Sequence, residues 1–163
     1  MSFFTQRFTS LCLTWLGDDV SSIRAAATVN LKVLSVQFGV AWTVENLVPE
    51  LHTLLTHPSY LRRLTGMQAA SIMSELDEEL TLSDLLPLVL SLATDAVPNI
   101  RFNVAKALVT MAPWLTAASI TTSVMPCLET LREDKDRDVV YFSKEAIRKI
   151  KEEQKSKLAA ANQ

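Results

Sequence analysis

The sequence predicts an all-α protein in which about four helical hairpins stack into an α-α superhelix, or solenoid. The chain of 163 residues contains only three glycines, and its abundant Leu, Ala, Glu and Lys favour helices over a many-stranded β fold. Apolar residues recur every three or four positions, which is the spacing of an amphipathic helix. Prolines and arginines also repeat at intervals of 38 and 39 residues.

The repeat consists of two series of residues with the same period. The first series is Pro49, Pro87 and Pro126. The second series is Arg24, Arg62 and Arg101, each of which follows an aliphatic residue. In the fourth copy Val140 takes the arginine position, so the last unit keeps the pattern without the charge.

Within each period two helices flank a polar turn. In the third unit the first helix is predicted over residues 82–94, with Ser83 and Asp84 as candidate caps, and Pro113 ends the second helix. A hairpin of this size cannot bury both of its faces alone, so neighbouring hairpins must stack. We expect one domain over residues 1–163, with repeats at about 1–42, 43–80, 81–115 and 116–157.

Composition and charge exclude several classes of protein. With 48% hydrophobic and 21% charged residues the chain is globular and not disordered. Its formal net charge of −2 gives no sustained positive field for nucleic acid, and it has no apolar run of the ~20 residues that a membrane helix needs. It also lacks the basic start and apolar middle of a secretory signal. We therefore expect a cytoplasmic protein, with the nucleus as a second compartment, that binds neither nucleic acid nor membrane.

The chain carries no residue pattern that indicates an enzyme. Its only histidines are His52 and His57, and no Ser-His-Asp, His-Glu-x-x-His or phosphate-binding glycine loop accompanies them. The acidic residues at 75–79 lack the glycine and alternating ligands of a calcium loop. Cys12 and Cys127 lie in apolar helical patterns, where free cysteines are usually buried. No catalytic residue, cofactor, metal or disulfide is expected.

Residues 97–106 resemble the C-terminal HEAT repeats of the scaffold (65 kDa regulatory) subunit of protein phosphatase 2A. Motifs similar to that family follow in order through nearly the whole chain: Phe3-Phe4, Leu11-Cys12, Trp15-Leu16, Ile23-Arg24, Phe38-Gly39, Pro58-Ser59-Tyr60-Leu61 and residues 134–139. The resemblance implies a HEAT-repeat solenoid, of which this chain is a C-terminal fragment. It also implies a non-catalytic role, in which this fragment holds the phosphatase catalytic subunit, whereas missing N-terminal repeats hold a variable regulatory subunit.

In that family the catalytic subunit is contacted by the turn within each hairpin and by the start of the second helix. Carried over position by position, the expected partner-binding residues are Val20, Ser21, Tyr60, Leu61, Val97, Pro98, Arg137 and Asp138. The sequence departs from the family at Ser21, in place of an aromatic residue, at His57, in place of Asp, and at Val140, in place of Lys.

Two turns place aspartate and arginine at the same offset: Asp18 with Arg24, and Asp95 with Arg101. This offset indicates a ladder of hydrogen bonds that locks successive hairpins in register. Arg62 faces His57 instead, a weaker partner, and Arg63 lies beside it. One of these two arginines is expected to be free for a ligand, so Arg62 joins the partner-binding set. The register also predicts that Arg101→Ala lowers the melting temperature more than Arg63→Ala.

A second function, which belongs to another class of protein, also remains open. A HEAT-repeat transport or cytoskeletal adaptor would bind protein cargo in a concave groove. Such an adaptor needs aromatic and charged ladders along the second helices, which this chain shows poorly. An enzyme is the third hypothesis.

The first helix carries more apolar residues than its own hairpin partner can cover: Phe3, Phe4, Phe8, Leu11, Cys12, Trp15 and Leu16. Because exposed apolar patches usually drive association, we expect self-association through the N-terminal hairpin as a symmetric dimer. Light scattering over a dilution series should show a mass that rises with concentration, and Phe4→Glu combined with Phe8→Glu should abolish the rise. A strictly monomeric mass at high micromolar concentration would contradict this prediction.

Overall fold

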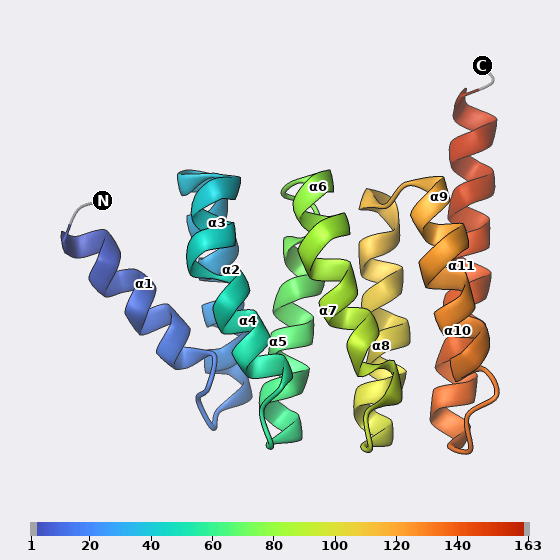
Figure 1. The fold of residues 1–163 in the computed structure, drawn as a ribbon, viewed down its shortest axis with the longest axis horizontal. Helices are drawn as coiled ribbons and strands as arrows, with labels where there is room; N and C mark the ends of the chain where they lie inside the picture. The colour runs from blue at the N-terminus through green and yellow to red at the C-terminus, as the bar shows by residue number, and fades with distance from the viewer. Residues whose placement is uncertain (1–2, 162–163) are drawn as a thin grey trace.

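The computed structural model describes residues 3–161, and every regular element in that range is helical (Figure 1). The first hairpin consists of α1 (Phe3–Trp15) and α2 (Ser21–Phe38). The second hairpin consists of α3 (Val40–Asn46), α4 (Val48–Leu55) and α5 (Tyr60–Met73). No helix within the described range is both long and apolar enough to cross a membrane.

The third and fourth hairpins are divided into more segments. The third consists of α6 (Glu78–Leu80), η1 (Thr81–Leu85), α7 (Leu86–Ser91), η2 (Leu92–Thr94), α8 (Pro98–Met111) and η3 (Ala112–Trp114). The fourth consists of α9 (Ala117–Ser119), η4 (Ile120–Val124), α10 (Met125–Leu131) and α11 (Arg137–Ala161). In each hairpin the segments before the turn form the first helix, and α2, α5, α8 and α11 are the second helices. The predicted all-α stack of four hairpins is therefore confirmed.

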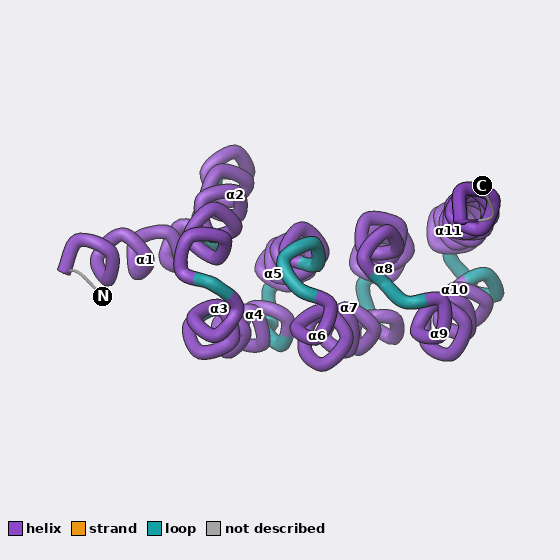
Figure 2. Tube along the Cα trace, turned by 90° about the horizontal axis from the view of Figure 1, so that it is seen from above, coloured by secondary structure: helices purple, strands orange, loops and turns teal. Residues whose placement is uncertain are grey.

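The hairpins form two layers (Figure 2). Seen from above, α2, α5, α8 and α11 lie in one row, and the first helices of the last three hairpins lie in another. The helix α1 is inclined away from these rows at the N-terminal end of the stack. All four turns within hairpins lie along one edge, and the connections between hairpins lie along the opposite edge. Stacking of this kind lets each hairpin bury a face against its neighbour.

Proline interrupts the regular α-helical winding of the first helices in the last three hairpins. Pro87 is the second residue of α7, and Pro126 is the second residue of α10. Because proline has no N–H and its ring crowds the preceding turn, the five residues before each of these helices wind as a π-helix. In η1 the N–H of Leu86 accordingly bonds to the carbonyl oxygen of Thr81. Pro49 has the same place in α4, where the first helix is interrupted between α3 and α4.

The first helix of the third hairpin begins earlier than the sequence predicts. The Asp77 carboxylate accepts the N–H of Leu80 at 2.8 Å and starts α6, so the candidate caps Ser83 and Asp84 lie inside the helix. Thr116 caps α9 in the same way. The polar residues that precede each apolar run conceal these starts, because the apolar spacing alone marks only the buried part of the helix.

Gly39 makes the connection between the first two hairpins. Its φ of 87° lies in the region that glycine adopts without steric cost. Its N–H donates to the Ser35 carbonyl at 2.8 Å, which ends α2, and its own carbonyl accepts the N–H of Thr43 at 3.2 Å, which starts α3. The chain therefore passes from one layer to the other at a single residue.

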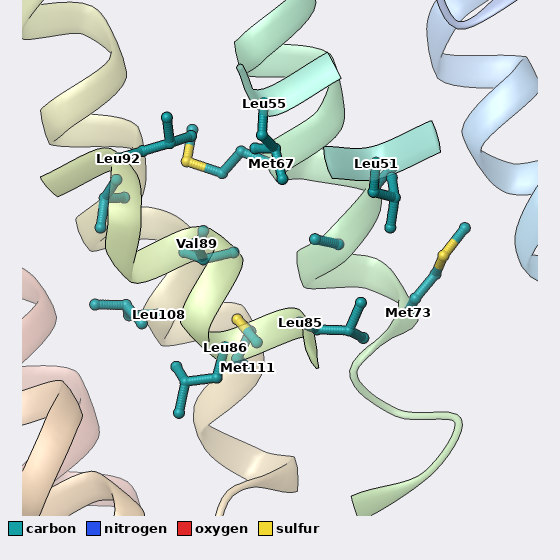
Figure 3. Close-up of a cluster of buried hydrophobic side chains, with 14 of the residues drawn as sticks. Leu51, Leu55, Met67, Met73, Leu85, Leu86, Val89, Leu92, Leu108 and Met111 are labelled. Atoms are coloured by element: carbon teal, nitrogen blue, oxygen red, sulfur yellow. The ribbon is translucent and has the colours of Figure 1, made fainter. Parts of the chain in front are cut away.

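A continuous apolar core lies between the two layers (Figure 3). Side chains of the second and third hairpins interleave there, and none of the following is more than 6% exposed: Leu51, Leu55, Met67, Met73, Leu85, Leu86, Val89, Leu92, Leu108 and Met111. Met67 and Leu108 come from the second helices of neighbouring hairpins, and both are fully buried. Neighbouring hairpins therefore share one core.

The first hairpin leaves apolar surface exposed. Val29, Val33 and Val36 share one face of α2 and are 54%, 61% and 68% exposed. This exposure is of the kind that self-association would cover, and self-association stays a prediction. The side chains of Phe3 and Phe4, which belong to the predicted contact, lie outside the described residues.

Candidate partner-binding edge

The candidate site is the edge of the stack that carries the turns within the four hairpins (Figure 1). We call it the turn edge, and it comprises residues 16–20, 56–59, 95–97 and 132–136 together with the first turns of α2, α5, α8 and α11. Backbone groups in such turns need hydrogen-bond partners outside the helices. The side chains that supply these partners recur with the period of the repeat.

One side chain in each turn holds the backbone two residues further on. In three turns an aspartate Oδ1 accepts this main-chain N–H at 2.8 Å: Asp18, Asp95 and Asp134. In the second turn His57 takes the same position, and its Nδ1 accepts the N–H of Ser59 at 2.9 Å. His57 therefore reproduces the turn contact of the aspartates without their negative charge.

In each of the first three turns an arginine reaches back to its own turn. It lies six residues after the turn side chain, which is Asp18, His57 or Asp95. Nη1 of Arg24, Arg63 and Arg101 each donates to two main-chain carbonyl oxygens, at distances between 2.7 and 3.3 Å. The structure therefore puts Arg63 in this series, and the sequence register that placed Arg62 there is wrong by one residue. Counting from the turn side chain, and not from the preceding arginine, identifies Arg63.

The same arginines bind the next hairpin with their remaining nitrogens. Nε and Nη2 of Arg63 donate to the two carboxylate oxygens of Asp95 at 2.6 and 2.9 Å. Arg101 binds Asp134 in the same way at 2.7 and 2.8 Å. The predicted ladder is thus present with a different pairing, because each carboxylate comes from the following turn. Two parallel bonds of this kind fix orientation as well as distance.

Both ion pairs are largely withdrawn from water. The side chains of Arg63 and Asp95 are 14% and 7% exposed, and those of Arg101 and Asp134 are 8% and 12% exposed. Removing one member of such a pair leaves an uncompensated buried charge. The two pairs therefore hold the second, third and fourth hairpins at a fixed spacing along the turn edge.

The ion pairs shift the pKa values of their members. The hydrogen bond from Arg101 is the main reason that the pKa of Asp134 is lowered. Burial alone would raise the pKa of Asp95, but hydrogen bonds from Arg63 and from a main-chain N–H bring it below its usual value. The hydrogen bond to Asp134 in turn raises the pKa of Arg101. The shifts show that the ion pairs stabilise the charged forms of both partners.

The joint between the first and second hairpins is built differently. His57 follows Arg24 by 33 residues, the interval that separates Asp134 from Arg101, and no carboxylate of the described residues forms an ion pair with Arg24. Contact is made instead by an ion pair between Lys32 and Glu75. The guanidinium of Arg62 also packs over Gly17, where an added Cβ would lie 2.7 Å from Nη1.

The structure places the residues predicted to bind a partner along the turn edge. Seven of them are exposed: Val20, Ser21, Tyr60, Leu61, Arg62, Arg137 and Asp138. The apolar members Val20, Tyr60 and Leu61 are 52%, 42% and 41% exposed. Val97 and Pro98 are half-buried, because Val97 packs against the core. Ile23, which is not among the residues predicted from the sequence, is 36% exposed in the first turn of α2. Contact of these residues with a partner stays a prediction.

The layer of second helices carries a shallow groove of about 400 Å³. It is lined by residues of α2, α5 and α8, which include Val29, Ile72 and Lys106. The Lys106 Nζ lies 3.9 Å from the centre of the Phe142 ring and 4.7 Å from that of Phe102, which is within the range of a cation–π interaction. An adaptor would have this apolar wall and this cation available for cargo.

The thiols and acidic groups of the described residues form no metal site. Cys12 is buried, Cys127 is half-buried, and both are free. Burial raises the pKa of the Cys127 thiol to about 11, which keeps the thiol protonated and unreactive. No cluster of three or more His, Cys, Asp or Glu residues in the described part of the chain could hold a metal ion.

Loss of a ladder arginine should destabilise the chain according to its carboxylate partner. The sequence register predicts a larger effect for Arg101→Ala than for Arg63→Ala, but both arginines bind an aspartate in the same way. Arg63→Ala and Arg101→Ala should therefore each lower the free energy of unfolding by about 3 kcal/mol, because each leaves a buried aspartate unpaired. Arg24→Ala should cost about 1 kcal/mol, because only hydrogen bonds to carbonyl oxygens are lost. Urea unfolding followed by circular dichroism measures all three, and equal losses would contradict the role of the carboxylates.

The ion pairs should also make stability depend on acid. The pKa values of Asp95 and Asp134 are lowered in the folded chain, so their contribution is fully present above the unfolded value near 3.8 and is lost as pH falls through the folded values. Unfolding free energies measured from about pH 6 to about pH 2 should fall less steeply in a variant with Asp95→Asn and Asp134→Asn. An unchanged slope would show that these aspartates do not carry the acid sensitivity.

Comparisons with known proteins agree with this architecture. A HEAT-repeat family model matches residues 85–115, which include α7 and α8. The crystal structure of an engineered protein matches 88% of this chain and 62% of that chain with a TM-score of 0.54. Because the sequence identity to that protein is 16%, the likeness shows the fold alone.

Three relatives are regulatory subunits of a phosphatase. The A-type regulatory subunit of protein phosphatase PP2A from Saccharomyces cerevisiae is 36% identical over 130 residues, which cover 74% of this chain and 20% of that protein. Its namesake from Schizosaccharomyces pombe is 39% identical over 79 residues, which cover 48% and 13%. The PP2A 65 kDa regulatory subunit of Drosophila melanogaster is 48% identical over 56 residues, which cover 34% and 10%.

The chain thus spans a fifth or less of the length of these relatives. All three are named as regulatory subunits, in keeping with the expectation that this chain is not an enzyme. Over the aligned residues the chain is homologous to the A-type, 65 kDa regulatory subunit of protein phosphatase 2A, and its fold is that of HEAT repeats.

Proposed function

We propose that this chain is a non-catalytic scaffold that binds the catalytic subunit of protein phosphatase 2A through its turn edge. The homology to the 65 kDa regulatory subunit supports this function. The observation that carries the proposal is the exposed pair Tyr60 and Leu61 beside Arg62, at the start of α5. Aromatic and arginine side chains near the centre of an interface typically supply most of the binding energy.

A stiff edge suits this role. The pairs Arg63–Asp95 and Arg101–Asp134 hold three turns at a fixed spacing. A partner that matches this spacing binds a surface that is already ordered, so less conformational entropy is lost on binding. The exposed charges of Arg137 and Asp138, on the same edge as Tyr60, would then face the partner together with the apolar residues.

The remaining contacts of a holoenzyme would lie outside this chain. We infer from the resemblance of residues 97–106 and 134–139 that the chain supplies C-terminal repeats of a longer scaffold. A variable regulatory subunit would then bind repeats on the N-terminal side of α1. The adaptor hypothesis has less support, because the relatives are named as phosphatase subunits.

Tyr60→Ala should weaken binding of the purified phosphatase catalytic subunit by ~30-fold, because loss of a central anchor costs on the order of 2 kcal/mol. Surface plasmon resonance measures the affinity, and circular dichroism should show unchanged helix content. Trp114→Ala is the matched control, since Trp114 is an aromatic residue that is 47% exposed and ends η3, in the connection between the third and fourth hairpins. Equal affinities of the Tyr60→Ala and Trp114→Ala variants would contradict the anchor role.

A further inference from the structure

We propose that the layer of second helices binds an amphipathic helix of a partner protein. The apolar face of this helix lies against the groove between α2, α5 and α8, and an acidic residue beside that face pairs with Lys106. The surface belongs to the row formed by α2, α5, α8 and α11 (Figure 2) and contains no residue of the turn edge. The proposal therefore does not rest on the function proposed above.

Two shallow hollows on this layer share a lining residue. The first, of about 400 Å³, is lined by residues of α2, α5 and α8, which include Val29 and Ile72. The second, also of about 400 Å³, is lined by residues of α8 and α11, which include Val109 and Phe142. Lys106 lines both hollows. We call the residues that line the two hollows the groove face, and it extends over all four second helices.

Apolar surface continues from the first hollow along α2. Val29 lines the hollow, and Val33 and Val36 follow it on the same face of the helix, where all three are exposed. A partner helix that lies beside α2 would cover these valines with apolar residues at the same three- and four-residue spacing. This arrangement of anchors is typical of an amphipathic helix bound in a groove.

The polar groups of the groove face favour a helical partner over an extended one. An extended segment needs hydrogen-bond partners for its main chain, whereas a helix supplies its own. Four uncharged polar side chains of the first hollow already donate to a main-chain carbonyl of their own helix, at distances between 2.7 and 3.3 Å: Thr28, Ser71, Asn103 and Thr110. Gln68 is the remaining uncharged polar side chain of this hollow, and one amide does not suffice for an extended main chain.

The charge of the groove face favours an acidic partner. Within residues 7–159, whose side chains are described, Lys106 is the only charged residue of the first hollow, and no carboxylate forms an ion pair with it. In the second hollow Glu145 is already bound by Arg148 and Lys149. The groove face thus presents a cation without a counterion, although the whole chain has a formal net charge of −2. A carboxylate of the partner would complement this charge.

Two aromatic rings hold Lys106 in place. Its Nζ lies 3.9 Å from the centre of the Phe142 ring and 4.7 Å from that of Phe102. An ammonium group has three N–H donors, so contact with two rings leaves a donor for a carboxylate. Because the cation is positioned before the partner arrives, less side-chain entropy is lost on binding.

The proposal can be tested with a synthetic helical peptide of about 18 residues that carries leucines on one face and glutamates beside them. In a matched peptide lysines replace the glutamates. NMR of the methyl groups of the chain records binding. With the acidic peptide the Val29 and Ile72 signals should shift and saturate with a Kd on the order of 100 µM, and the basic peptide should bind at least ~10-fold more weakly.

Lys106→Glu should weaken binding of the acidic peptide by at least ~10-fold, because it puts like charges opposite each other. Lys151→Glu is the matched control: it makes the same change of charge at an exposed lysine of α11 that lines neither hollow. This control should leave the affinity for the acidic peptide unchanged.

Three results would overturn the proposal: equal affinities of the two peptides, equal effects of Lys106→Glu and Lys151→Glu, or unmoved Val29 and Ile72 signals. Shifts of these signals when the chain alone is concentrated would show that a second copy covers the groove face, and would overturn it as well. The comparison of the two peptides on the native chain requires no variant, so it stands even where a variant fails to fold.

Discussion

The turn edge depends on arginine side chains that are bound in two directions at once. Arg63 and Arg101 each hold carbonyl groups of their own turn and the aspartate of the next turn. One side chain thus couples the conformation of a loop to the spacing between two hairpins. Because these pairs are largely buried, a change of spacing would separate charges that are poorly solvated. The positions of the exposed residues follow from these contacts beneath them.

The core and the prolines are compatible with the fixed spacing of the turns. The π-helical segments before Pro87 and Pro126 let a helix continue past a residue that has no N–H, where it would otherwise end. Each of these first helices therefore extends from one edge of the stack to the other (Figure 1). Its turn then lies beside the turn of its neighbour, and the apolar core between the two layers keeps them together.

The first hairpin departs from the others in several related ways. The helix α1 is inclined away from the stack, α2 exposes a stripe of valines, and Arg24 forms no ion pair with a carboxylate of the described residues. Among the described residues this hairpin packs against one neighbouring hairpin only, so fewer contacts constrain it.

The sequence by itself determined the helical class, the four hairpins and the place of each turn, because apolar spacing, proline and a repeat period are local signals. The presence of His57 in place of an aspartate was also visible in the sequence. Only the tertiary structure decided that Arg63, and not Arg62, joins the ladder, and that its carboxylate is Asp95 of the following turn. A period that alternates between 38 and 39 residues leaves an uncertainty of one position. One position on a helix turns a side chain by about 100°. The packing of α5 against α8 therefore determines which of the two arginines points toward the next hairpin.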